Sequence, residues 1–208
     1  MFRLSVGSSQ LALLIFSVSA HLLAQTPPPL KLKTYNNQRY AVIFQYPATW
    51  NSSLNMRFYA PPQIVLSGYP VLAAVGFGDS LPNQQRTEYP NTNLAGVQFS
   101  YAVLPTATEQ QCQDAAKNGG NIDKSTSERI NGVNYLHVST DSAGMCHQVA
   151  EEIYAASHAG RCYLFDALIE TICADTIEGA RNITPAEINT VKLQLQHIMQ
   201  SVKLDAKK

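Results

Sequence analysis

Alternation of hydrophobic and polar residues along the first half of the chain predicts three β-strands. The segment 40–46 carries aromatic and β-branched residues at the two-residue period of a strand face, and Pro47 ends it. The segment 71–77 is continuously apolar, which predicts a more buried strand, and Gly96–Leu104 alternates again. Trp50, the only tryptophan, is expected to close one end of the core.

Two helices are predicted from capping residues and from apolar residues at helical spacing. Thr106 and Glu109 form a capping pair for a short helix that Gly119 ends. Its inward face consists of small residues: Cys112, Ala115 and Ala116. Thr184–Glu187 supplies an N-cap, a first-turn proline and a capping glutamate for the closing helix. Its apolar stripe, expected to cover one face of the sheet, consists of Ile188, Val191, Leu195, Ile198, Met199 and Val202.

The second half of the chain predicts a strand over Gly132–Thr140 and then a long hairpin. The segments 149–157 and 161–171 are typical of strands, and Ala159–Gly160 joins them. Ala159 is a poor residue for the left-handed conformation that a two-residue turn requires, so a longer loop or a bulge would shift the register.

The register of this hairpin constrains the four cysteines, Cys112, Cys146, Cys162 and Cys173. With a two-residue turn, Cys146 lies opposite Cys173 at the open end, whereas Cys162 lies beside the turn, tens of ångströms away. A disulfide needs Cα atoms within about 7 Å. We therefore expect the disulfides Cys146–Cys173 and Cys112–Cys162. The alternative is that some of these cysteines stay reduced and buried.

The start of the chain has the composition of a secretory signal peptide. Arg3 precedes a short apolar run, Leu11–Val18, and small residues then offer cleavage after Ala20 or Ala24. This run is shorter than the ~20 residues of a membrane-spanning helix. We expect no transmembrane segment after the leader is cleaved.

Three segments are expected: a signal peptide over 1–24, a proline-rich tether over 25–34 and a single domain over 35–208. The even number of cysteines, 4, fits the oxidising conditions of the periplasm or the cell exterior. The expected location is therefore periplasmic or secreted.

The charge of the chain limits its partners. Lys and Arg number 15, as do Asp and Glu, and basic residues form a block only at Lys207–Lys208. The basic patch of a nucleic-acid-binding protein and the polybasic segment of a membrane-surface protein are therefore missing from the sequence. The expected partner is an extracytoplasmic protein or a small ligand.

Neither a metal site nor a cofactor site is expected. His158 with Cys162, and Cys146 with His147, have the residue types of a metal site, but the hairpin separates the two pairs by most of a strand. Gly119–Gly120 follows a helix instead of opening one, so it does not predict a phosphate-binding loop.

No catalytic residue is assigned from the sequence. The Gly-x-Ser-x-Gly and His-Glu-x-x-His motifs of common hydrolases do not occur. His137 and Ser139 share a strand face near Asp141, which makes them the candidates for an alternative function, an exported hydrolase or metal-dependent enzyme. A concave pocket around His137 and Ser139 would favour that enzyme, and a flat sheet face would favour a binding domain.

The acidic residues of the hairpin do not form a catalytic pair in the predicted register. Glu152 faces Ala167 and Asp166 faces Ile153, so the two carboxylates point to opposite faces. Each acidic residue is expected to be solvated or to accept a hydrogen bond at the edge of the core.

Three segments together resemble one known group of proteins. These are the aromatic strand that leads into Trp50, the hairpin over 153–163, and the closing amphipathic helix that ends in Ser201–Leu204. Their order is similar to that of exported PsbP/Mog1-like α/β/α sandwich proteins, although Ala159 replaces the Asn often found in that turn. The resemblance implies an α+β fold with a mainly antiparallel sheet and helices on both faces. It carries over no catalytic residue, because the group shares no catalytic motif.

The prediction is therefore an exported, non-catalytic domain that binds or helps to assemble an extracytoplasmic partner. An exported hydrolase or metal-dependent enzyme is the main alternative. An envelope-associated structural protein, held by its proline-rich start, is a third possibility.

Overall fold

The computed structural model describes residues 30–52, 68–78, 88–117 and 122–205. Its strands are β1 (Leu32–Asn37), β2 (Val42–Pro47), β3 (Asn51–Ser52), β4 (Val71–Gly78), β5 (Leu94–Leu104), β6 (Ile122–Ile130), β7 (Val133–Gly144), β8 (His147–His158), β9 (Arg161–Ile172) and β10 (Lys203–Leu204). Its helices are α2 (Glu109–Lys117), the short 3₁₀-helix η1 (Ala174–Thr176) and α3 (Pro185–Ser201).

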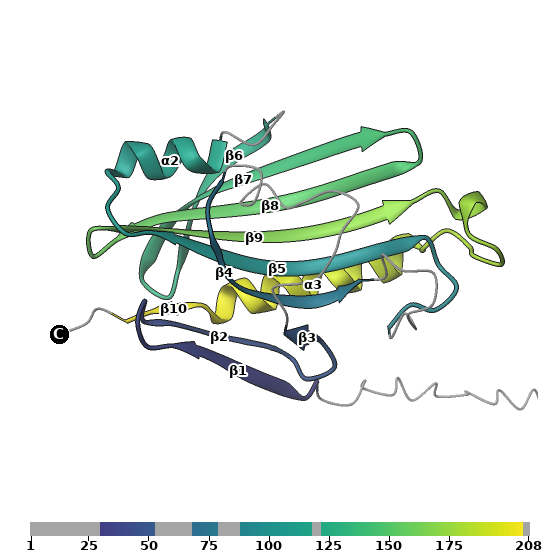
Figure 1. The fold of residues 1–208 in the computed structure, drawn as a ribbon, viewed down its shortest axis with the longest axis horizontal. Helices are drawn as coiled ribbons and strands as arrows, with labels where there is room; N and C mark the ends of the chain where they lie inside the picture. Colours follow the sequence, from purple (N-terminus) through teal and green to yellow (C-terminus); the bar gives the residue numbers. More distant parts are fainter. Residues whose placement is uncertain (1–29, 53–67, 79–87, 118–121, 206–208) are drawn as a thin grey trace, which may run out of the picture.

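A seven-stranded antiparallel sheet, in the order β3-β4-β5-β9-β8-β7-β6, forms the centre of the molecule. A smaller sheet, in the order β1-β2-β10, packs directly on the large one, with Phe44 of β2 against Phe99 of β5. The helix α3 packs against both β2 and β5 (Figure 1). The fold is therefore of the α+β class with a mainly antiparallel sheet, as the sequence predicts.

The helices α2 and α3 pack against opposite faces of the large sheet. Along β9, Tyr163 and Phe165 point toward the core that contains α3, whereas Cys162 and Leu164 point toward α2. This alternation follows from the two-residue period of a strand. The helix α2 covers only one end of its face, where small side chains allow close packing.

The predicted hairpin of β8 and β9 has the expected register. His158 pairs with Arg161 across a two-residue turn, and Ser157 pairs with Cys162. Both turn residues adopt the left-handed conformation, with φ of 49° at Ala159 and 72° at Gly160. Ala159 thus occupies a conformation that alanine rarely adopts, because the long paired strands fix the turn.

The start of α3 is confirmed, whereas the start of α2 differs from the prediction. Thr184 caps α3, and Glu187 completes the capping box. The short helix α2 is capped by Thr108 with Gln111, not by Thr106 with Glu109. Thr108 is the residue that immediately precedes the helical turn, so its hydroxyl reaches the orphan N–H of Gln111.

Four strands, β1, β3, β6 and β10, are not predicted from the sequence pattern. Of these, β3 consists of two residues that pair with β4. Residues 32–34 were expected in the tether but form the start of β1, where they pair with β2. Lys203–Leu204 was expected to end the closing helix but forms β10, again paired with β2. The edge strand β6 is polar and carries no alternation of apolar residues, so only its pairing with β7 makes it a strand.

Cysteines are joined at both ends of the β8–β9 hairpin. Cys112 of α2 is bonded to Cys162 beside the turn, with Cα atoms 5.3 Å apart. Cys146 is bonded to Cys173 at the open end, with Cα atoms 4.6 Å apart.

Within the described ranges, no helix combines the length and apolar character that a bilayer crossing requires.

Candidate functional site

A cavity of about 620 Å³ lies between the ends of β7, β8 and β9 and the start of α3. Apolar side chains line part of it: Ala143, Val149, Ala150, Ile169, Ile183, Pro185 and Ile188. Polar side chains complete the lining: Asn93, Asp141, Ser142, Gln148, Thr171, Asn182 and Lys192. The lining is therefore mixed, half apolar and half polar, and the volume falls in the usual range of small-molecule sites, about 300–1,000 Å³.

The sheet side of the cavity follows from strand register. Asp141 pairs with Ala150, and Ala150 pairs with Ile169, so their side chains form one row on the face that carries α3. Ala143, Gln148 and Thr171 form the next row toward the end of the sheet by the same pairing. Two adjacent rows on one face therefore supply this side of the cavity.

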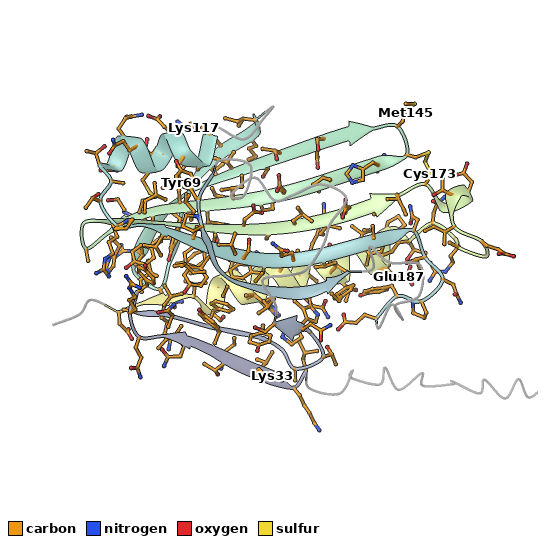
Figure 2. All side chains as sticks on the ribbon, in the orientation of Figure 1. Lys33, Tyr69, Lys117, Met145, Cys173 and Glu187 are labelled. Carbon is orange, nitrogen blue, oxygen red and sulfur yellow. A yellow bond between two sulfur atoms is a disulfide. The ribbon has the colours of Figure 1, made fainter. Side chains whose placement is uncertain are left out.

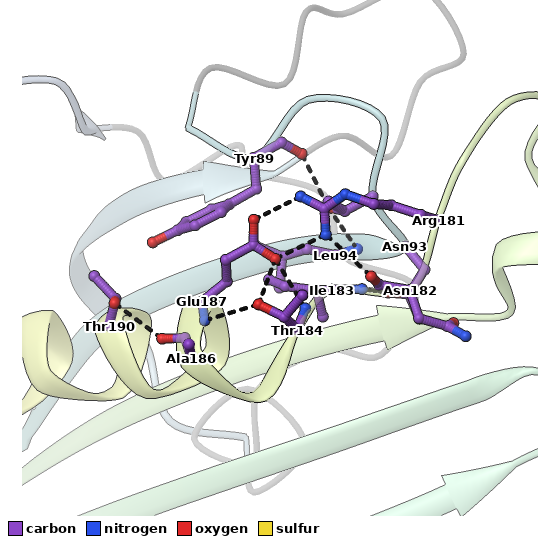
Figure 3. Close-up of polar contacts among 11 residues, drawn as sticks. Tyr89, Asn93, Leu94, Arg181, Asn182, Ile183, Thr184, Ala186, Glu187 and Thr190 are labelled. Atoms are coloured by element: carbon purple, nitrogen blue, oxygen red, sulfur yellow. Dashed lines mark hydrogen bonds and ion pairs between the residues drawn. The ribbon is translucent and has the colours of Figure 1, made fainter. Parts of the chain in front are cut away.

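The opposite side of the cavity is held in place by Asn93. The Asn93 side chain donates to the carbonyl of Ile172 and accepts from the N–H of Ile183, both at 2.7 Å. The backbone N–H of Asn93 donates to the carbonyl of Arg181 at 2.9 Å. One residue thus fixes the end of β9 and the segment that leads into α3. Figure 3 shows Asn93 beside Arg181 and Ile183 of that segment.

The first turn of α3 is anchored by a second set of contacts, also drawn in Figure 3. Arg181 donates to both carboxylate oxygens of Glu187, at 2.6 and 2.8 Å. Hydrogen bonds from Arg181 and from the N–H and hydroxyl of Thr184 lower the pKa of Glu187 to about 2. The wall that carries Ile183 and Ile188 is therefore preorganised by bonds within the protein.

A polar cluster lies on the same sheet face, next to the cavity. Ser139 donates to Oε2 of Glu152 at 2.5 Å, and Nε2 of His137 lies 2.6 Å from the same oxygen. The His137 ring stacks on Tyr154, with centroids 4.2 Å apart, and its Nδ1 lies 3.7 Å from Glu128. The imidazole is therefore held between two carboxylates.

The charge of Glu152 connects this cluster to the cavity. Burial by itself raises the pKa of Glu152. Hydrogen bonds from His137 and Ser139 and the nearby charge of Lys192 lower it by more than burial raises it, so the pKa of Glu152 lies below its ordinary value. Lys192 also lines the cavity. Glu152 is thus an ionised acceptor at neutral pH.

This arrangement differs from a catalytic triad. An ionised carboxylate only accepts hydrogen bonds, so Nε2 of His137 carries a proton and cannot remove one from Ser139. Ser139 directs its own proton to Glu152. The acid therefore lies between the serine and the histidine, whereas in a triad the histidine lies between the other two.

The residues proposed for the enzyme alternative are only partly brought together at the cavity. His137, Ser139 and Asp141 share one face of β7, as expected, and Asp141 lines the cavity. His137 and Ser139 are not among the described residues that line it. Glu152 was not predicted as their partner, although pairing β7 with the predicted hairpin places it opposite Ser139.

The acidic residues on the other face are buried, not solvated. Asp166 and Glu170 are fully buried, and Glu151 is 5% exposed. Glu152 and Asp166 do point to opposite faces, as expected from the register. His147 bonds to Glu170 from the same face of the sheet.

The suggested Cys/His metal pairs lie at opposite ends of the hairpin. Cys162 is beside the turn and bonded to Cys112, and Cys146 is at the open end and bonded to Cys173. Among the described residues, the ligand atoms of Cys146, Cys173 and Asp175 lie close enough together to hold a metal ion. Both of these sulfur atoms are already bonded to each other in a disulfide.

No protein family model matches the chain, and no curated protein matches it. Among solved structures, the chain is similar to cyanobacterial PsbP from Synechocystis sp. PCC 6803, with 14% identity over 86% of this chain and 95% of that chain and a TM-score of 0.46. It is also similar to the Saccharomyces cerevisiae Ran-binding protein Mog1p, with 10% identity, coverage of 85% and 96%, and a TM-score of 0.47. A Pseudomonas aeruginosa protein of unknown function, PA94, has 8% identity, coverage of 85% and 99%, and a TM-score of 0.44. Both proteins named in the sequence resemblance, PsbP and Mog1, are thus represented among these structures.

Proposed function

We propose that this protein is an exported, non-catalytic domain that binds an extracytoplasmic partner through the cavity beside α3. In this proposal the leader over 1–24 is removed, both disulfides form in the oxidising compartment, and residues 35–208 act as one domain. The bound part of the partner is a small ligand or an exposed side chain with an apolar body.

The observation that carries this proposal is the preformed cavity. Ile169 and Ile188 offer apolar surface from two different elements, the sheet and α3. Polar groups at its rim, such as Gln148 and Lys192, are positioned to orient a bound group. Because Asn93 and Glu187 already fix the wall, binding does not require this wall to become ordered.

The polar cluster supports a binding role more than a catalytic one. His137 and Ser139 are both engaged with Glu152, which leaves neither arranged as base and nucleophile. A fixed row of charged and polar groups next to the cavity is instead suited to holding the polar part of a ligand.

The test is a pull-down from the organism's own envelope fraction with a variant that fills the cavity. Ala150→Trp places a large ring between Asp141 and Ile169, its strand neighbours. Ser125→Trp is the matched control, because Ser125 is an exposed strand position on the opposite face. Bound proteins and small molecules are identified by mass spectrometry.

We expect a ligand or protein that is retained by the wild type and by Ser125→Trp and is lost with Ala150→Trp. Equal retention by all three proteins would show that the cavity is not the binding site. Turnover of generic ester or phosphate substrates that Ser139→Ala abolishes would instead establish the hydrolase alternative.

A further inference from the structure

The two disulfides differ sharply in their access to solvent. Cys112 and Cys162 are 2% and 0% exposed, because α2 packs over them against the sheet. Cys146 is exposed and Cys173 is half-buried. Met145, next to Cys146 in the turn, is 100% exposed. A thiol from another protein can therefore approach only the second of these disulfides in the folded state.

The accessible disulfide joins the turn between β7 and β8, which contains Cys146, to Cys173, which follows the end of β9. Met145 and Cys146 form a two-residue turn between β7 and β8, and of these two residues only Cys146 has a positive φ, 57°. Figure 2 shows Met145 and Cys173 at the same end of the molecule. A hollow of about 230 Å³ lies beside the bond and is lined by Cys146, Cys173 and Asn182, among others.

Asp175 lies next to the two sulfur atoms. A carboxylate oxygen of Asp175 and the Sγ atoms of Cys146 and Cys173 all lie within 4.8 Å of one another. Negative charge develops on sulfur during thiol–disulfide exchange, both on the attacking thiolate and on the leaving group. A neighbouring carboxylate opposes that charge and so slows the exchange.

We propose that Cys146–Cys173 is a thiol–disulfide exchange site for a protein dithiol of the Cys-x-x-Cys class, and that Asp175 controls its rate. The thiolate of the dithiol attacks Sγ of Cys146, the Sγ–Sγ bond breaks, and the electron pair leaves on Sγ of Cys173, which takes up a proton. The second thiol of the dithiol, as a thiolate, then attacks its own mixed-disulfide sulfur and releases Cys146, which is also protonated. Two electrons and two protons reach the chain, and the dithiol becomes a disulfide; the reverse sequence forms the bond.

Reduction of this disulfide would loosen the chain segment that begins at Cys173 and leads to one side of the cavity. The N–H of Cys173 donates to the carbonyl of Cys146 at 3.0 Å, so the disulfide joins segments that are already adjacent. Cys173 begins the segment that leads through η1 to Asn182 and Ile183, which line the cavity. The reduced form therefore keeps its fold but holds the segment 173–183 less firmly.

The first experiment follows reduction of the full-length gene product, purified in its oxidised form under native conditions. A thioredoxin-class protein with its NADPH-driven reductase serves as the dithiol, new thiols are alkylated, and modified cysteines are mapped by mass spectrometry. We expect Cys146 and Cys173 to be modified at least about tenfold faster than Cys112 and Cys162. Equal rates for the two pairs, or modification of Cys146 and Cys173 only in denaturant, would overturn the proposal.

The second experiment tests Asp175 with a matched control. Asp175→Asn removes the carboxylate beside the sulfur atoms, and Glu178→Gln removes an exposed carboxylate from the same connecting segment. We expect Asp175→Asn to accelerate reduction several-fold and Glu178→Gln to leave the rate near that of the wild type. Added salt should accelerate the wild type more than Asp175→Asn, because salt screens the charge that the variant lacks.

A rate for Asp175→Asn equal to the wild type, or an equal response of both to salt, would remove Asp175 from the proposal. Amide hydrogen exchange gives an independent readout of the reduced form. We expect faster exchange within 173–183 and unchanged protection of β5, whereas loss of protection throughout the sheet would contradict a local exchange site.

Discussion

At the scale of single residues, the cavity depends on side chains that satisfy backbone groups far away in the sequence. Asn93 is the main example, because its amide bonds to Ile172 and to Ile183. Nothing local in the sequence around Asn93 predicts this role. It arises only when β5, β9 and the segment before α3 come together.

Asn93→Ala is expected to lower the free energy of unfolding by about 1–3 kcal/mol, because it leaves a carbonyl and an N–H without their partners. Urea denaturation followed by circular dichroism measures the change. Asn134→Ala, at an exposed position of β7, is the control and should stay close to the wild type. An Asn93→Ala protein as stable as this control would show that the two bonds do not hold the wall.

Glu152 gives a pH-dependent prediction at the same scale. Its pKa is lower in the folded protein than the ordinary glutamate value of about 4.3, so its charge stabilises the fold above that pH. This stabilisation is lost as the pH falls through the lowered pKa of the folded state. Glu152→Gln should therefore lower the melting temperature at pH 7 and have a smaller effect near about pH 3.

Thermal melts at both pH values test this dependence, with Glu109→Gln at an exposed position of α2 as the control. A difference between wild type and Glu152→Gln that is equally large at both pH values would contradict the stated role of the Glu152 charge.

At the scale of elements, the helix that borders the cavity is specified locally. Thr184, Pro185 and Glu187 define its start in the sequence and in the structure. Arg181 adds a bidentate contact to Glu187 that the sequence analysis did not predict, since it depends on the path of the chain before the cap. The strands β1, β6 and β10 are different, because pairing with neighbours defines them more than their own patterns do.

Thr184→Ala is expected to cost about 1 kcal/mol of stability, because it removes the acceptor for the N–H of Glu187. Thr184→Ser keeps the hydroxyl and should remain near the wild type. Chemical denaturation of the three proteins measures the difference. Equal losses in both variants would assign the effect to the threonine methyl group and not to the cap.

At the scale of the whole molecule, the disulfide between Cys112 and Cys162 attaches α2 to the sheet. It spans a sequence separation of 50 residues, for which loop-closure entropy gives a stabilisation of about 4 kcal/mol. The double variant Cys112→Ala/Cys162→Ala should lose about that amount in urea denaturation. An unchanged midpoint would mean that packing of Ala115 and Ala116 alone secures the helix.

The sequence by itself determined the strands of the β8–β9 hairpin, their register and the N-terminal cap of α3, because these depend on side-chain period and on neighbours within a few residues. From that register it also indicated which cysteines can meet. Only the tertiary structure decided that Glu152 accepts from both His137 and Ser139, and that Asn93 holds Ile183. The Glu152 contacts require the pairing of β7 with β8. The Asn93 contacts join elements whose relative positions are fixed by packing of the whole core, and no local pattern encodes that packing.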